Sequence, residues 1–281
     1  MKDRVGFMQG RLVDQIDGKI QAFPLAQWQQ EFPIAQHLDL RLMEWTLDDQ
    51  GLEKNPICTP EGQAQIRHLS ARHSLRVVSV TGDCFMQAPF WKTDGRTLQD
   101  YLVKKLDLTI SATGALGARH IVIPLVDNGG LDNVEQARAL HRLLMQRHAL
   151  LQAFKVRIAF ESDLAHHALR DFISEYPADC FGINYDIGNS ASLGYDPEQE
   201  MTSYAHRVIN VHVKDRELGG STVPLGTGAA KMKEVLSGLR NSRYTGNFIL
   251  QTARAKDGDH ALTLARYLDW TYDHLEQHFG P

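Results

Sequence analysis

The chain has 281 residues, of which 43% are hydrophobic and 23% are charged, and its formal net charge at pH 7 is −4. This length is typical of one α/β barrel, and a chain of this size buries a core without needing disulfide bonds. The slight acidity and the lack of a Lys/Arg block exclude the basic face that nucleic-acid binding requires.

The cysteines are odd in number and far apart in the sequence, at Cys58, Cys84 and Cys180. This spacing predicts reduced thiols in a reducing compartment. The N-terminal residues lack the apolar region of a secretory signal, and no apolar stretch approaches the roughly 18 residues of a membrane span. We therefore expect a cytoplasmic protein with neither a membrane nor a nucleic acid as partner.

Short apolar runs alternate with longer amphipathic stretches along the whole chain. The runs, which resemble strands buried on both faces of a parallel sheet, lie at 5–8, 42–45, 77–80, 120–124, 156–160, 181–185, 208–213 and 248–250. The amphipathic stretches predict helices at 25–38, 60–74, 97–117, 131–154, 164–176, 197–206, 229–241 and 258–278. Asp132-Asn133 and Asp257-Gly258-Asp259 are helix-start signals within this pattern. Eight strand–helix units in one chain predict the α/β class and a single (β/α)₈ TIM barrel over residues 1–281.

Polar side chains stand at the ends of the last four predicted strands. They are Glu161 in the fifth, Asp186 in the sixth, His212 in the seventh and Gln251 in the eighth. In this barrel the C-terminal strand ends carry the chemistry. Carboxylate, imidazole and amide oxygen together suit a divalent cation, with Mn²⁺ or Zn²⁺ favoured over Co²⁺ or Mg²⁺. The pattern therefore predicts one metal ion held by these four side chains.

Several stretches resemble the sugar-phosphate isomerase/epimerase superfamily of xylose isomerase-like TIM barrels. The matching stretches are Asp186-Ile187-Gly188-Asn189, His212-Val213-Lys214-Asp215 and Val223-Pro224-Leu225-Gly226-Thr227-Gly228, together with Glu161 at the end of the fifth strand. The nearest members in these motifs are L-ribulose-5-phosphate 3-epimerase and hexulose-6-phosphate isomerase-like proteins. The resemblance implies a metal-dependent isomerase or epimerase of a small sugar or sugar phosphate, acting through a metal-stabilised enediolate. It also implies Glu161 as the catalytic base and a homodimer or homotetramer.

Gln251 departs from the family pattern, which usually has glutamate at this position. An amide oxygen can still bind a hard cation, but an amide cannot act as a base near neutral pH. Epimerisation needs proton transfer on two faces, whereas isomerisation can use one base. The change therefore favours one-base chemistry, or a different second acid such as Lys214 or Asp83.

Substrate contacts are expected from Glu44 at the end of the second strand, from Asn189, from Lys214 and Arg216, and from Arg254. For each of these a structural role is the alternative. The glycine-rich stretches 219–222 and 226–228 follow the seventh strand, where backbone N–H groups often bind phosphate. A plain surface loop is the alternative there.

Other functions remain open on the sequence. Gln251 is compatible with a non-catalytic sugar-binding homologue, and an inosose-type dehydratase uses the same barrel. A nuclease of the endonuclease IV type is disfavoured, because it needs several more histidines at strand ends and a more basic surface.

Overall fold

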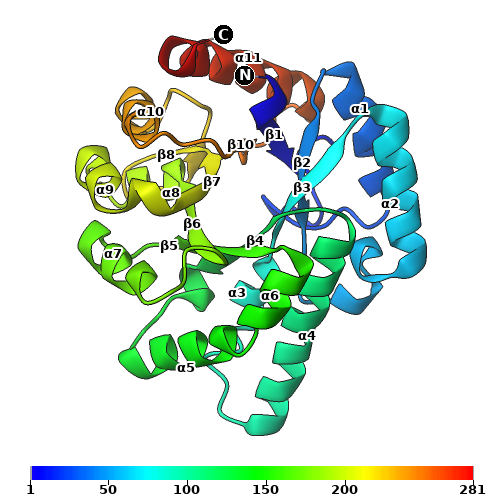
Figure 1. The fold of residues 1–281 in the computed structure, drawn as a ribbon. Coiled ribbons are helices and arrows are strands. Elements are labelled where there is room, and N and C mark those ends of the chain that lie inside the picture. Colours follow the sequence, from blue (N-terminus) through cyan, green and yellow to red (C-terminus); the bar gives the residue numbers. More distant parts are fainter. Residues whose placement is uncertain (1, 281) are drawn as a thin grey trace.

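Eight parallel strands form a closed barrel in the computed structural model, which describes residues 2–280 (Figure 1). The barrel strands are β1 (Val5–Met8), β2 (Leu42–Thr46), β3 (Arg76–Thr81), β4 (His120–Leu125), β5 (Arg157–Ser162), β6 (Phe181–Asp186), β7 (Val208–Val213) and β10 (Asn247–Leu250). Their order around the barrel is β1-β10-β7-β6-β5-β4-β3-β2, so each strand lies beside its predicted neighbours. The predicted TIM barrel is thus confirmed, and all eight strands agree with prediction to within two residues. The predicted domain also includes Met1 and Pro281, which lie outside the described residues.

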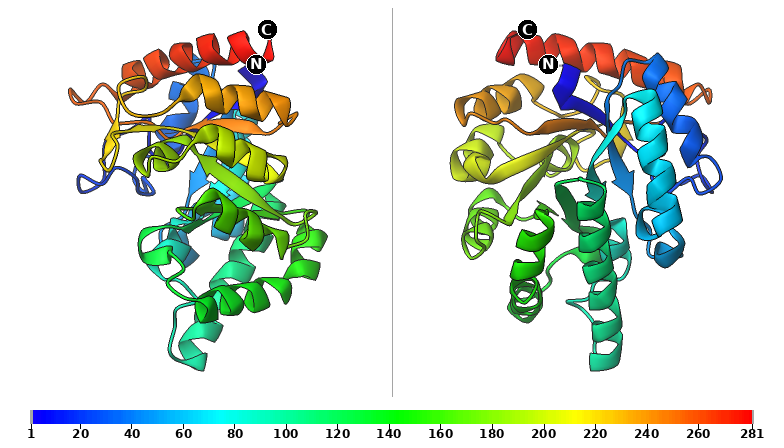
Figure 2. Two further views of the ribbon diagram at one scale, coloured as in Figure 1. Left: turned by 90° about the vertical axis from the view of Figure 1, so that its left-hand side faces the viewer. Right: turned by 45° about the vertical axis from the view of Figure 1, so that its right-hand side comes forward.

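Helices surround the strands on the outside of the barrel, as Figures 1 and 2 show. They are α1 (Glu31–His37), α2 (Pro60–His73), α3 (Asp83–Gln87), α4 (Arg96–Ala115), α5 (Val134–Met145), α6 (His148–Phe154), α7 (His166–Ser174), α8 (Ile187–Ser192), α9 (Pro197–Tyr204), α10 (Met232–Asn241) and α11 (His260–Phe279). Single 3₁₀ turns lie at Lys2–Arg4, Trp28–Gln30, Leu52–Lys54, Pro56–Cys58, Asp127–Gly129 and Ala205–Arg207. Asn133 and Asp259 cap α5 and α11 as predicted, each accepting a hydrogen bond from a backbone N–H three residues on.

The single helix predicted over 131–154 is wrong. The structure divides it into α5 and α6 at Gln146 and Arg147. Arg147 leaves the helical conformation, with φ −102° and ψ 2°, and its guanidinium pairs with Asp107 of α4 at 3.0 Å. The break redirects α6 so that it packs against α4, where Phe154 lies against Gly114.

A two-stranded antiparallel hairpin, β8 (Asp215–Arg216) with β9 (Thr222–Val223), follows β7 and was not predicted. The buried Asp215 carboxylate accepts hydrogen bonds from the backbone N–H groups of Gly226, Gly228 and Ala230 at 2.9–3.0 Å. These N–H groups are therefore occupied within the chain. For residues 226–228 the structure favours a loop fixed by Asp215 over a phosphate site.

Closure of the barrel depends on β1, which pairs with both β10 and β2. Gly6 allows the close approach to β2, because a Cβ there would lie 2.7 Å from the carbonyl oxygen of Leu42. The start of β1 also lies beside the end of α11 in both views of Figure 2. The guanidinium carbon of Arg4 stands 5.3 Å from the ring centroid of Phe279.

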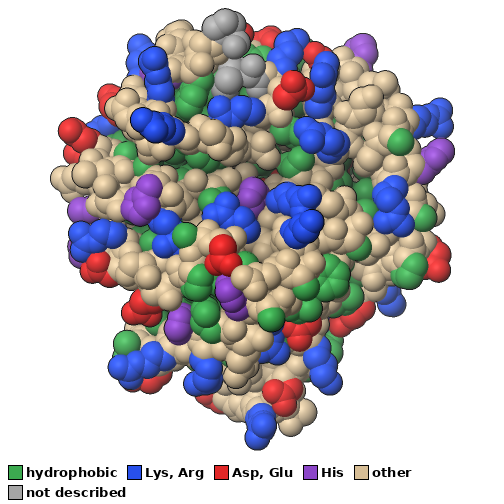
Figure 3. All heavy atoms as spheres, viewed as in Figure 1, with side chains coloured by type: hydrophobic (Ala, Val, Ile, Leu, Met, Phe, Trp, Pro, Cys, Tyr) green, Lys and Arg blue, Asp and Glu red, His purple; other side chains and the backbone are tan. Residues whose placement is uncertain are grey.

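Charges of both signs are interspersed on the face of the molecule that Figure 3 shows, with Lys and Arg side chains next to Asp and Glu. Between residues 2 and 280, no helix combines the length and the apolar character that crossing a membrane requires.

Candidate active site

Three of the four predicted metal ligands converge at the C-terminal end of the barrel. One donor atom from each of Glu161, Asp186 and His212 lies within 4.8 Å of the others, and all three side chains are buried. They come from β5, β6 and β7, which are neighbours in the barrel. Asp186 pairs in register with His212, so parallel strand pairing brings the two to the same level.

His212 is oriented by Glu44, which lies opposite it inside the barrel. The carboxylate of Glu44 accepts a hydrogen bond from Nε2 of His212 at 2.7 Å, and both side chains are fully buried. This contact leaves Nδ1 facing Glu161 and Asp186, at 3.0 and 3.9 Å from their carboxylate oxygens. A histidine whose second nitrogen donates to a carboxylate is the usual arrangement for metal binding.

The same contacts set the charge of the imidazole. Burial disfavours the charged ring, but Glu44 and Glu161 outweigh it and raise the pKa of His212 to about 10. Burial likewise opposes charge on Glu44, yet His212 and two further donors lower the pKa of that carboxyl. When both ring nitrogens of His212 carry protons, His212 and Glu44 therefore form an ion pair. The proton on Nδ1 must leave before Nδ1 can bind a metal.

Neutral polar side chains inside the strands complete this network and were missed by the sequence reasoning. Ser79 and Asn210 donate to the second oxygen of Glu44 at 2.6 and 2.9 Å. Asn184 donates to Glu161 at 2.8 Å and contacts Nδ1 of His212 at 3.0 Å. A signal existed, because Asn184 lies two residues before Asp186 and Asn210 two before His212. Residues two apart in a strand point to the same face.

Asn189, in the short helix α8 after β6, contacts two of the predicted metal ligands. Its amide nitrogen donates to Glu161 at 2.8 Å, and its backbone N–H donates to the carboxylate of Asp186 at 2.8 Å. Its amide oxygen accepts from Lys214 at 3.1 Å and from Arg216 at 3.0 Å. Asn189, Lys214 and Arg216 are thus brought together beside Glu161 and Asp186, two of the predicted metal ligands.

Gln251 is linked through Lys214 to Asp186, another of the predicted metal ligands. The ammonium of Lys214 donates to Asp186 at 3.2 Å and to the amide oxygen of Gln251 at 3.3 Å. Two of the four predicted ligands therefore already hold one positive charge. This contact indicates that these oxygens favour a cation at this position.

A cavity of about 180 Å³ opens over these side chains at the barrel mouth. Its walls include the predicted residues Glu161, Asn189, Lys214, Arg216 and Gln251. Asp83, which the sequence suggested as a possible second acid, lines it as well, together with Arg11 and Gln21, which were not assigned to the site from the sequence. A polar cavity of this kind beside convergent titratable groups is the usual form of a small-molecule site.

Comparison with known proteins agrees with this geometry. The family model described as a xylose isomerase-like TIM barrel matches residues 21–274. The chain belongs to this family. The crystal structure of the IOLI protein with a bound zinc atom superposes with a TM-score of 0.75 at 12% identity, covering 99% of this chain and all of that one. D-psicose 3-epimerase in the presence of D-fructose gives a TM-score of 0.76 at 10% identity, with 99% and 100% covered. At these identities the likeness concerns the fold alone.

A curated relative in sequence is L-ribulose-5-phosphate 3-epimerase from Salmonella typhi, at 28% identity over 92 residues. The match covers 32% of this chain and 32% of the relative. The chain thus spans about a third of the length of the curated relatives it matches. The membership in the xylose isomerase-like family rests on the family model, which covers most of the chain.

Two residues expected to contact substrate in this xylose isomerase-like barrel have other surroundings. Glu44 is fully buried below the cavity, where it binds His212, and it does not line the cavity wall. The guanidinium of Arg254 donates to the backbone carbonyls of Gly10 and Val13. It lines a separate surface groove, so the structure favours a role for Arg254 in holding the segment after β1.

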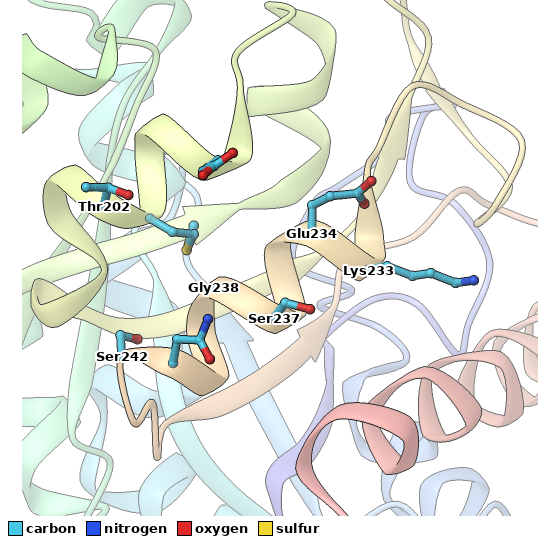
Figure 4. Close-up of a pocket in the computed structure, with 9 residues that line it drawn as sticks. Thr202, Lys233, Glu234, Ser237, Gly238 and Ser242 are labelled. Carbon is cyan, nitrogen blue, oxygen red and sulfur yellow. The ribbon is translucent and has the colours of Figure 1, made fainter.

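Another hollow lies outside the barrel between α9 and α10, with a volume of about 660 Å³ (Figure 4). Thr202 of α9 and Glu234, Ser237 and Gly238 of α10 border it. It contains none of the predicted site residues. The cavity at the strand ends is therefore the candidate active site.

Proposed function

We propose that the protein is a divalent-metal-dependent isomerase or epimerase of a small sugar or sugar phosphate. The observation that carries this proposal is the convergence of Glu161, Asp186 and the Nδ1 atom of His212 within 4.8 Å at the mouth of the barrel. Membership in the xylose isomerase-like family supports the same reaction class.

The residues fit a divalent cation. Two carboxylates, an imidazole oriented by Glu44 and an amide oxygen from Gln251 form a mixed donor set that suits Mn²⁺ or Zn²⁺, with Co²⁺ or Mg²⁺ as alternatives. When bound, such an ion polarises a ketose carbonyl and its neighbouring hydroxyl, which acidifies the adjacent C–H. The contact of Lys214 with Asp186 and Gln251 supports a cation-favouring position.

Glu161 is the proposed proton-transfer group at carbon. Its carboxylate is buried and receives hydrogen bonds from the amide nitrogens of Asn184 and Asn189, both at 2.8 Å. These contacts fix the carboxylate against the cavity wall, and a fixed carboxylate near the substrate carbon serves as a general base. Asn189, Lys214 and Arg216 are the proposed groups for substrate hydroxyls or an anionic substituent.

The test combines metal analysis with turnover. The purified protein is expected to carry about one divalent ion per chain, and to interconvert at least one member of a panel of pentuloses and hexuloses, free and phosphorylated. Glu161→Gln should lower the rate by about 100-fold or more while the circular dichroism spectrum and melting curve stay unchanged. Glu175→Gln, which changes an exposed carboxylate just after α7, is the matched control. Absence of metal binding after titration with manganese and zinc, or unchanged turnover in Glu161→Gln, would contradict the proposal.

One observation favours a second candidate, a sugar-binding homologue without turnover. Gln251 is an amide, and Lys214 contacts both this amide and Asp186, so the site holds a positive charge of its own. This candidate predicts ketose binding by calorimetry with no exchange of substrate hydrogen for solvent deuterium. An inosose-type dehydratase would instead release a product lighter by one water, which mass spectrometry detects.

A further inference from the structure

A buried carboxylate outside the predicted ligand set lines the same cavity as Glu161. Asp83 stands at the start of α3, directly after β3, and its side chain is 9% exposed. Thr81 donates to one of its oxygens at 3.1 Å and Gln21 to the other at 2.6 Å. Both donors are neutral, so these two hydrogen bonds bring no positive charge to the carboxylate.

A chain of amides connects Asp83 to Gln251. The amide nitrogen of Gln251 donates to the oxygen of Gln21 at 3.0 Å, and the nitrogen of Gln21 donates to Asp83. Arg11 also donates to the oxygen of Gln21, at 3.2 Å. The segment after β1 thereby places Gln21 between the amide at the eighth barrel strand and the carboxylate after the third.

The position of Asp83 relative to Glu161 decides which proton it can move. β3 and β5 are separated only by β4, so Asp83 and Glu161 approach the cavity from neighbouring sectors of the barrel. The opposite wall is formed by the segment after β1 and the end of β10. In the described part of the chain, that wall presents Arg11, Gln21 and Gln251 to the cavity and no carboxylate.

We propose that Asp83 is a second catalytic residue, which exchanges a proton with the substrate oxygens while Glu161 exchanges one with carbon on a single face. This inference rests on the proposed function and selects isomerisation over epimerisation. Glu161 removes the proton from the carbon next to the carbonyl, the C–H electron pair forms the new C=C bond, and protonated Asp83 gives its proton to the carbonyl oxygen. Asp83 then takes the proton from the other hydroxyl, and Glu161 returns its proton to the former carbonyl carbon. No oxidant or co-reactant is needed, and both carboxyl groups regain their initial states.

The electrostatic surroundings of Asp83 suit this role. Burial is the main cause that raises the pKa of Asp83 to about 6, and the negative charges of Asp48 and Glu161 act in the same direction. The Gln21 and Thr81 hydrogen bonds oppose the rise, and Arg11 attracts the ionised form. A group that donates first and accepts later works best with a pKa near the working pH.

The experiment uses the metal-loaded protein and the ketose that the wild type converts fastest in the panel. Asp83→Asn is expected to lower kcat by about 100-fold or more and to change KM by less than about threefold. The wild-type kcat/KM should fall with rising pH as Asp83 loses its proton, and Asp83→Asn should lose this inflection. Asp83→Glu should retain part of the activity, and formate should restore part of it to Asp83→Ala. Glu175→Gln, which changes an exposed carboxylate outside the cavity, is the matched control and should keep a wild-type kcat.

Each contrary outcome is distinct. A wild type that converts no ketose and binds no metal removes the proposed function and this inference with it. An active wild type whose Asp83→Asn variant keeps its kcat overturns the role of Asp83 alone. A wild type that inverts a carbinol carbon without moving the carbonyl overturns the inference and leaves the proposed function intact. If Asp83→Asn is poorly folded, failure of both Asp83→Glu and formate to restore turnover assigns Asp83 a structural role and overturns the inference.

Discussion

Substitution of Glu44 by glutamine tests whether the barrel interior orients His212 for metal binding. The carboxylate receives three hydrogen bonds, from His212 at 2.7 Å, Ser79 at 2.6 Å and Asn210 at 2.9 Å. Glutamine keeps the volume but removes the charge, and its amide nitrogen cannot accept the hydrogens that now point at it. At least one of these three contacts is therefore lost.

The expected cost follows from the kind of contact that is lost. A hydrogen bond to a charged group contributes about 1.5–3 kcal/mol. Loss of the carboxylate behind a metal-binding histidine typically weakens metal affinity by about 10–100-fold, which corresponds to about 1.4–2.7 kcal/mol. The two ranges agree, so Glu44→Gln should raise the dissociation constant for Mn²⁺ or Zn²⁺ by one to two orders of magnitude. Competition with a chromophoric chelator measures this change.

The metal-free protein offers a second readout with a defined sign. The raised pKa of His212 contributes stability that is fully present below its ordinary value of 6.5 and is lost as pH rises through about 10. The lowered pKa of Glu44 contributes stability that is present above its ordinary value of 4.5. The difference in unfolding free energy between wild type and Glu44→Gln should therefore be largest at pH 5–6 and should shrink towards pH 10. Urea titrations at several pH values measure it.

Glu200→Gln is the matched control, because Glu200 is also a buried carboxylate, held by the hydroxyls of Tyr185, Ser190 and Tyr204. It should lose stability yet keep the wild-type metal affinity. A Glu44→Gln protein that binds metal within about twofold of the wild type would refute the proposed orientation of His212.

Metal affinity should rise about tenfold per pH unit between pH 6 and 8, because the pKa of His212 is about 10 and its proton must leave on binding. Chelator competition measures this slope, and a pH-independent affinity would exclude Nδ1 as a ligand. Gln251→Glu adds a third negative ligand and should tighten metal binding by about tenfold, and an equal or weaker affinity would argue against position 251 as a ligand. Gly6→Ala would bring a Cβ to 2.7 Å from the backbone oxygen of Leu42 and should reduce the unfolding free energy by about 1–3 kcal/mol in urea. Gly95→Ala, where a Cβ meets open space, should stay within about 0.5 kcal/mol, and similar losses in both variants would contradict the close-approach argument.

The barrel strands were predictable because each is a short apolar run bounded by helical patterns. The predictions failed for elements whose shape depends on contacts between residues far apart in the sequence. The apolar pattern continues through residues 131–154, so nothing local predicts the break that Arg147 makes with Asp107, 40 residues earlier. The hairpin β8–β9 has two residues per strand, which is too short for any periodic signal.

In the candidate site, too, strand positions were predictable from the sequence, whereas contacts between distant segments were not. Glu161, Asp186 and His212 could be placed because parallel strands bring their C-terminal ends to one level. The partner of His212 could not, because Glu44 lies 168 residues away and on the far side of the barrel interior. Asp83 could be listed as an acid from its position after the third strand. Its link to Gln251 depends on the course of the segment after β1, which carries no regular pattern.

The strand pairing of β1 has a consequence for how the molecule is made. β1, residues 5–8, leaves the ribosome well before one of its two neighbours, β10, which comprises residues 247–250. Until residues 247–250 emerge, β1 and β7 each present an unpaired edge, and such edges readily add strands from other molecules. Nascent chains whose synthesis stops before β10 should therefore aggregate or recruit chaperones, even though seven of the eight barrel strands are complete.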